Sequence, residues 1–200
     1  MVDQQIIKDM YDKAVLMVKD YSNPYANLMN PYSVIYEARH VEEIVRDNDI
    51  TSMADLGCGS ANIYRLTNSN IMRGVTYTGY DLNPNFVKYC SLRYPTIQFH
   101  EYDISTKNLK ESYDLIIMYE VLPYFTDDEI IDMIDYYYTK TNKVLSFVLL
   151  DKGEYDPGLN LIQVSCDDIL RRLRDKYSKI IMDYDTKNCK AYVDIYKEEE

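Results

Sequence analysis

The segment Asp55-Leu56-Gly57-Cys58-Gly59 has the clearest chemical potential in this 200-residue sequence. It begins at the end of an apolar run over residues 50–56 that predicts a β-strand, and a helical pattern follows over residues 61–68. Glycines in such a turn let the backbone bend sharply and approach a ligand without a Cβ in the way. A strand, a glycine turn and a helix in this order are typical of a nucleotide-binding loop.

A second acid, Asp81, ends the next predicted strand, 22 residues after Gly59. An acid at this spacing is typical of the residue that accepts hydrogen bonds from both ribose hydroxyls of a nucleotide. The alternative is that Asp81 only helps Asn83 to cap the following helix, which has Pro84 in its first turn. The glycine loop and the acid occur together, and this combination favours the ribose role.

Regular elements on both sides of these residues must hold them in place. Strands are predicted over residues 50–56, 75–80, 96–100, 113–118 and 143–150, helices over 61–68, 83–93, 126–137 and 165–177, and a terminal hairpin over 179–184 and 190–196. Strands that alternate with helices indicate parallel pairing, and a closing hairpin reverses the last strand. We therefore expect an α/β fold with a doubly wound, mostly parallel seven-stranded sheet and an antiparallel terminal strand at its edge.

Residues 1–48 predict an N-terminal helical cap, or lid, ahead of a domain that spans residues 49–200. One amphipathic helix is expected over residues 4–19, and a second carries the apolar stripe Val34, Ala38, Val41 and Val45. Two Asn-Pro-Tyr turns, at residues 23–25 and 30–32, predict a loop between the two helices.

The composition excludes several classes of protein. With 46% hydrophobic and 28% charged residues, the sequence is typical of a globular protein. It has no apolar run long enough to span a bilayer and no signal-peptide pattern, so we expect a cytoplasmic protein. The formal net charge of −11 disfavours nucleic acid as a partner. Four scattered cysteines and only two histidines predict free thiols and no metal site. The oligomeric state stays open.

Four motifs in order give the chain a family resemblance. Asp55-Leu56-Gly57-Cys58-Gly59, Tyr80-Asp81-Leu82-Asn83-Pro84, Glu101-Tyr102-Asp103-Ile104 and the strand 113–118 with the turn Tyr119-Glu120-Val121-Leu122 are similar to the motifs of class I S-adenosylmethionine-dependent methyltransferases. The resemblance covers residues 54–150, and the terminal hairpin fits this Rossmann-like fold as well. It indicates a methyltransferase of the small-molecule type.

The resemblance implies a role for each matching residue. The methionine end of S-adenosylmethionine would lie on Asp55, Gly57 and Gly59. Asp81 and Leu82 would hold the ribose and flank the adenine, and Asp103 with Ile104 would contact the adenine edge. Tyr119 and Glu120 would line the cofactor next to the sulfonium. The cofactor-binding set that the resemblance implies is Asp55, Gly57, Cys58, Gly59, Asp81, Leu82, Asp103, Ile104 and Tyr119.

The loop departs from two known patterns. Ser60 and Ala61 stand where a third glycine is usual, but both are small, so the backbone can still approach a ligand closely. Asn62 occupies the position where a dinucleotide fingerprint has glycine for close packing of helix and strand. This residue argues against NAD as the cofactor.

Three residues are candidates for the acceptor side. Glu120 follows the fourth strand, at the edge where such sheets bind ligands, although it could be a solvent-facing acid. Tyr124 lies in the same loop, and His40 lies on the second helix, where a half-exposed surface position is the plainer interpretation. A proton acceptor is needed only if the methyl acceptor keeps its proton until attack.

Taken together, the residues predict an enzyme that transfers a methyl group from S-adenosylmethionine to an O, N or C atom of a small molecule. A protein or peptide methyltransferase, and a partner that binds the cofactor without catalysis, are alternatives. An NAD-dependent oxidoreductase is less favoured.

Overall fold

The computed structural model describes residues 31–150, 164–186 and 189–198. The chain divides into two compact units, with the boundary between Ile104 and Ser105. The helix predicted over residues 4–19 and the turn at 23–25 lie outside the described residues.

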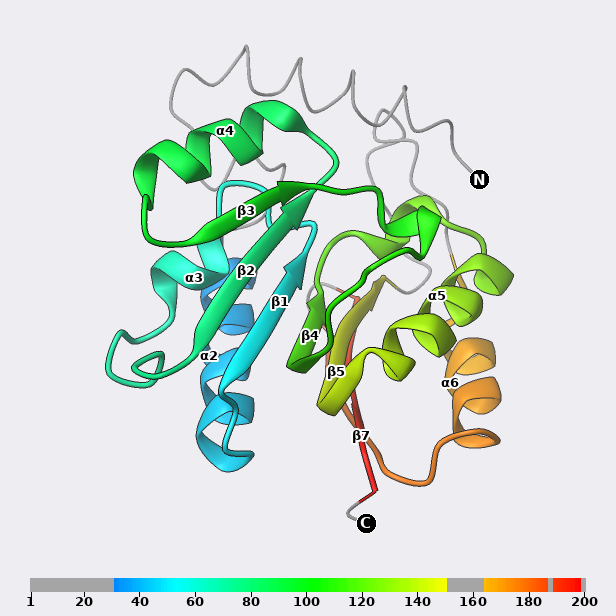
Figure 1. The fold of residues 1–200 in the computed structure, drawn as a ribbon. Helices are drawn as coiled ribbons and strands as arrows, with labels where there is room; N and C mark the ends of the chain where they lie inside the picture. Colours follow the sequence, from blue (N-terminus) through cyan, green and yellow to red (C-terminus); the bar gives the residue numbers. More distant parts are fainter. Residues whose placement is uncertain (1–30, 151–163, 187–188, 199–200) are drawn as a thin grey trace. The chain divides into compact units, whose positions relative to one another are not determined.

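The first unit contains three helices and three strands in the described part of the chain (Figure 1). They are α2 (Pro31–Asp47), β1 (Ser52–Leu56), α3 (Asn62–Leu66), β2 (Thr76–Asp81), α4 (Pro84–Arg93) and β3 (Gln98–Glu101). The strands are parallel in the order β3-β2-β1, and α4 packs against β2 and β3. Parallel pairing brings the carboxyl ends of β1 and β2, and therefore the glycine loop and Asp81, to the same edge.

Helix α2 confirms the predicted apolar stripe, because Val34, Ala38, Val41 and Val45 are all buried. Its start differs from the prediction, since the Asn-Pro-Tyr turn at 30–32 was expected in a loop and the helix begins at Pro31. Proline fits the first helical position because the N–H it lacks would have no partner within the helix there.

Gly79, in the middle of β2, is a position where the packing requires glycine. A Cβ added to it would lie 2.5 Å and 2.7 Å from two ring carbons of Phe99 and 3.0 Å from Sγ of Cys58. We expect Gly79→Ala to lower the free energy of unfolding by roughly 1–3 kcal/mol, the usual cost of overpacking a core. Urea denaturation measures this loss.

The matched test of the Gly79 prediction adds Phe99→Leu, which shortens the side chain that the new methyl group meets. The loss of stability in the double variant should be smaller than the sum of the two single losses. Additive losses would contradict a steric conflict with the Phe99 ring.

The second unit carries the other four strands of the described chain. Its elements are β4 (Tyr113–Met118), the 3-10 helix η3 (Leu122–Tyr124), α5 (Asp127–Thr139), β5 (Thr141–Leu150), α6 (Cys166–Arg174), β6 (Ile180–Asp185) and β7 (Lys190–Tyr196). The order is β4-β5-β7-β6, with β7 antiparallel to both of its neighbours. Strand β7 therefore lies inside the sheet, and β6 is the edge strand.

The predicted fold class is confirmed: a doubly wound α/β fold whose seven described strands are mostly parallel, with an antiparallel terminal strand. Among the described helices, none is both long and apolar enough to cross a lipid bilayer.

Candidate functional site

The glycine loop is tied to the end of β2 by its own backbone. Gly57 N and Cys58 N both donate to the carbonyl oxygen of Tyr80, at 2.7 Å and 2.9 Å. Gly57 and Gly59 have φ values of 85° and 52°, in the left-handed region that favours glycine. The loop is therefore a fixed turn at the carboxyl edge of the first unit's sheet.

Asp81 connects this loop to the start of α4. Its Oδ2 accepts a hydrogen bond from Gly59 N and its Oδ1 accepts one from Asn83 N, both at 2.8 Å. The side chain is half-buried, and burial raises the pKa of Asp81 to about 6. A carboxylate has about four acceptor positions, so each oxygen can accept one further bond from a ligand hydroxyl. The bond to Asn83 N supports the alternative that Asp81 helps to cap the start of α4. It does not use all the acceptor positions of the carboxylate, so Asp81 can also bind the ribose.

Ala61 takes the place of a third glycine and adopts the backbone conformation that a glycine would. Its φ is 57°, which is uncommon for a residue with a Cβ, and its side chain is fully buried. The loop thus turns left-handed at Gly57, Gly59 and Ala61, as the small residues at positions 60 and 61 allow.

Asp55, near the end of β1, is a buried acid that is only 3% exposed. The hydroxyl of Tyr77 donates to Asp55 Oδ2 at 2.6 Å. Burial, with a smaller contribution from the charge of Asp81, raises the pKa of Asp55 to about 7, although the Tyr77 bond lowers it. The Asp55 side chain is thus held by Tyr77 on β2, and its predicted contact with the methionine end of the cofactor stays a prediction.

Asn62, the first residue of α3, is buried with one donor unused. Its Oδ1 accepts a hydrogen bond from Nη2 of Arg65 at 2.9 Å. Its Nδ2 is buried and has no hydrogen-bond partner among the described residues. Buried polar groups are normally paired, so this amide fits a site that a polar ligand completes.

The third motif continues the same edge. Tyr102 N donates to the carbonyl oxygen of Asp81 at 2.9 Å, which carries the pairing of β2 and β3 one residue past β3. Asp103 follows, half-buried, and Ile104 is buried. Leu82 is also half-buried. The structure thus brings Asp81, Leu82 and the third motif to one edge of the first unit.

The second unit holds Tyr119 and Glu120 directly after β4. The hydroxyl of Tyr119, which is buried, forms a hydrogen bond of 2.8 Å with Oγ of Ser146 on β5. The Tyr119 ring also meets that of Tyr192 edge-on, with 6.2 Å between the ring centres. Tyr119 is therefore fixed from two neighbouring strands.

Glu120 forms an ion pair with Lys190, the first residue of β7. Lys190 pairs with Leu150 in the sheet, so the ion pair lies at the carboxyl end of β5. The side chain of Lys190 is 9% exposed and that of Glu120 is 20% exposed. Glu120 also has a left-handed φ of 59°, a strained conformation of the kind that gathers at functional sites.

The other two acceptor candidates are less informative. Tyr124 is buried in η3, in the same loop region as Glu120. His40 is half-buried on α2 in the first unit. Their proposed catalytic roles stay predictions.

Sequence reasoning did not find Tyr77, Ser146 and Lys190, which support the predicted residues. Tyr77 and Ser146 lie inside strands and carry no spacing signal. Lys190 could have been noticed as a charged residue at the start of a mostly apolar terminal strand, because a buried strand has little room for an unpaired charge.

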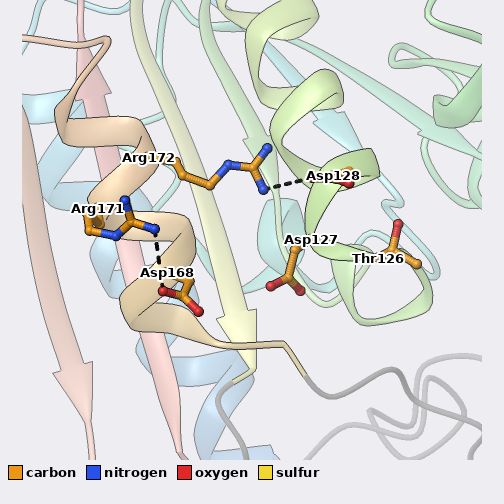
Figure 2. A pocket seen from close by; sticks show the side chains of 6 residues that line it. All are labelled: Thr126, Asp127, Asp128, Asp168, Arg171 and Arg172. Carbon is orange, nitrogen blue, oxygen red and sulfur yellow. Dashed lines mark hydrogen bonds and ion pairs between the residues drawn. The ribbon is translucent and has the colours of Figure 1, made fainter.

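A separate hollow lies between the start of α5 and α6 (Figure 2). It is lined by Thr126, Asp127, Asp128, Asp168, Arg171 and Arg172. Both arginines are already paired, Arg172 with Asp128 at 2.9 Å and Arg171 with Asp168 at 3.6 Å. None of the predicted site residues lines this hollow.

Comparisons with known proteins agree with the geometry of the loop. Residues 54–143 match the family model that is described as a methyltransferase domain. The chain is 27% identical over 78 residues to protein 235L of Invertebrate iridescent virus 6, whose name proposes a methyltransferase. That match covers 39% of this chain and spans only 29% of the relative's length.

Two solved structures share the fold over nearly the whole chain. Magnesium protoporphyrin IX methyltransferase of Synechocystis PCC 6803, with bound S-adenosylmethionine, has a TM-score of 0.71 at 15% identity and covers 99% of this chain and 98% of its own. The N-methyltransferase NodS of Bradyrhizobium japonicum WM9, with S-adenosylhomocysteine, has a TM-score of 0.65 at 14% identity and covers 94% and 98%. These two likenesses confirm the fold, and the match of residues 54–143 to a methyltransferase domain confirms the predicted resemblance over that part of the chain.

Proposed function

Starting from a methyltransferase domain at residues 54–143, we propose that this chain binds S-adenosylmethionine at the loop 55–59 and at Asp81, and methylates a small molecule. The acceptor atom in this proposal is O, N or C. The observation that carries it is the carboxylate of Asp81, which joins Gly59 N and Asn83 N and keeps acceptor capacity for two ribose hydroxyls.

The residues of the first unit fit the cofactor chemically. Asp81 is half-buried with a pKa of about 6, so its carboxylate is charged at neutral pH and suits a ligand with a positive sulfonium and ammonium group. When bound, S-adenosylmethionine supplies a methyl group that is already activated by the positive sulfur, so the protein mainly has to position the reactants.

Glu120 is the proposed proton acceptor on the acceptor side. Its carboxylate is partly exposed, so it can receive a proton from the hydroxyl or amine of an acceptor. Lys190 pairs with the same carboxylate and holds it in place from β7. This arrangement supports general-base assistance without a dedicated catalytic dyad.

A small-molecule acceptor is supported by the two solved relatives, whose names describe a porphyrin methyltransferase and an N-methyltransferase. The net charge of −11 makes a nucleic acid an unfavourable acceptor. A basic peptide is the main competing acceptor on the same charge argument.

Calorimetry on the full chain tests the cofactor. S-adenosylmethionine and S-adenosylhomocysteine should bind in the micromolar range, and NAD should not bind. Tighter binding of NAD than of S-adenosylmethionine would overturn the assignment. Transfer of tritiated methyl groups into pools of small metabolites, peptides and RNA then identifies the acceptor class, with label expected in the metabolite pool.

Glu120→Gln tests the role of Glu120 in methyl transfer separately from cofactor binding. Glutamine keeps the size of the side chain and an oxygen for Lys190, so cofactor binding should stay within twofold of the parent protein. Methyl transfer should fall by about 100-fold, which is within the usual range for losing a positioned proton acceptor. An unchanged rate would remove Glu120 from the mechanism.

A further inference from the structure

The side-chain amide of Asn62 is a buried hydrogen-bond donor without an acceptor among the described residues. The residue is 3% exposed, and its Nδ2 has no partner among the described residues. Leaving a buried donor unpaired destabilises the free protein, because water is lost and nothing replaces it. A ligand with an acceptor atom at this position would remove that penalty.

Arg65 sets the orientation of this amide. Its guanidinium donates to Asn62 Oδ1 at 2.9 Å, one turn further along α3. Since the oxygen is committed to Arg65, the nitrogen is the part of the amide left to meet a ligand. Arg65 also adds a positive charge next to it, which favours an anionic acceptor over a neutral one.

The neighbouring loop cannot take over this role with the donors that are accounted for. Gly57 N and Cys58 N donate to Tyr80 O, and Ala61 N donates to Cys58 O at 2.8 Å. Gly59 N donates to Asp81. Four backbone donors that could have bound an anion are therefore engaged within the protein.

The charge at the loop affects which end of a cofactor it can hold. The carboxylate of Asp81, which accepts a hydrogen bond from Gly59 N, suits the positive groups of a cofactor, but it repels a second carboxylate. A cofactor with an amino-acid end therefore needs a donor and a positive charge elsewhere in this unit. Asn62 and Arg65 supply both, directly after the loop.

We propose that Asn62 Nδ2 binds the carboxylate of the methionine part of S-adenosylmethionine, with Arg65 holding the amide in the productive orientation. The inference rests on the proposed function and adds Asn62 to its cofactor-binding residues. Arg65 is a positioning residue, because it acts through Asn62.

Two ligands that differ only in the amino-acid end test this inference by calorimetry. S-adenosylhomocysteine has the carboxylate, and 5′-methylthioadenosine keeps the nucleoside and the thioether without it. Asn62→Asp should weaken the binding of S-adenosylhomocysteine by roughly 10-fold to 100-fold, because it replaces a donor with a negative charge that repels the carboxylate of the ligand. Binding of 5′-methylthioadenosine should stay within twofold. Asn62→Ala should give the same selective loss without the added charge.

Asn70→Ala is the matched control, because Asn70 is exposed in the same unit. It should bind both ligands as the parent does, and thermal unfolding should show that all three variants are folded. Equal weakening of the two ligands in Asn62→Asp, or no weakening of S-adenosylhomocysteine, would overturn the role of Asn62. If the parent binds neither S-adenosylmethionine nor S-adenosylhomocysteine, the proposed function fails and the inference fails with it.

Discussion

Asp81→Ala is expected to weaken the binding of S-adenosylmethionine by about 2–4 kcal/mol, or roughly 30-fold to 1,000-fold. Part of the loss is the hydrogen bonding of a charged carboxylate to the ribose hydroxyls. The rest arises because Gly59 N and Asn83 N lose their acceptor, so the loop and the start of α4 lose the group that joins them. Calorimetry with the full chain measures the change.

Asp81→Asn serves as an intermediate variant. Its single carbonyl oxygen can accept from Gly59 N or from Asn83 N, but its amide nitrogen can accept from neither. Its affinity should therefore fall between those of the parent and Asp81→Ala. Asp47→Ala, at an exposed position at the end of α2, should leave binding unchanged. An affinity of Asp81→Ala within threefold of the parent would mean that the ribose lies elsewhere.

The second large effect concerns pH and Asp55. Burial raises the pKa of this carboxyl group from 3.8 to about 7 in the folded protein. The folded state therefore holds the proton more tightly than the unfolded chain does. The resulting stability is fully present below pH 3.8 and is lost as the pH rises towards 7.

Asp55→Asn should abolish this part of the pH dependence. Asparagine carries no titrating proton, and its oxygen can still accept from the Tyr77 hydroxyl. Between pH 4.5 and pH 8, the unfolding free energy of the parent should fall relative to that of Asp55→Asn by roughly 3–4 kcal/mol. Urea denaturation at the two pH values measures the difference.

The test compares how much the unfolding free energy of each protein changes between the two pH values. The cost of burying the new amide group is the same at both pH values, so it does not affect this comparison. Asp183→Asn, at an exposed position on β6, should follow the parent at both pH values. Parallel pH curves for the parent and Asp55→Asn would show that the Asp55 carboxyl group titrates normally.

Local patterns were sufficient for most of the fold. Strand β4 and helix α4 were predicted with their observed ends, apart from the capping residue Asn83, because a short apolar run and a proline at a helix start are local signals. The position of β7 was not predicted, since it was expected at the edge and lies between β5 and β6. Strand order depends on contacts between residues far apart in the chain. The local sequence of a hairpin does not show which of its two strands pairs with the rest of the sheet.

The sequence by itself determined the class of fold, the methyltransferase motifs and the identity of the acids and glycines at the loop. Those features follow from residue type and spacing, which a single chain displays directly. Only the tertiary structure decided which partner each polar group has. It joined Asp81 to Gly59, Asp55 to Tyr77 and Glu120 to Lys190, pairs that are separated by 22, 22 and 70 residues. Pairing and burial set the charge and the available donors of a site, so the unused amide of Asn62 became visible only in the folded chain.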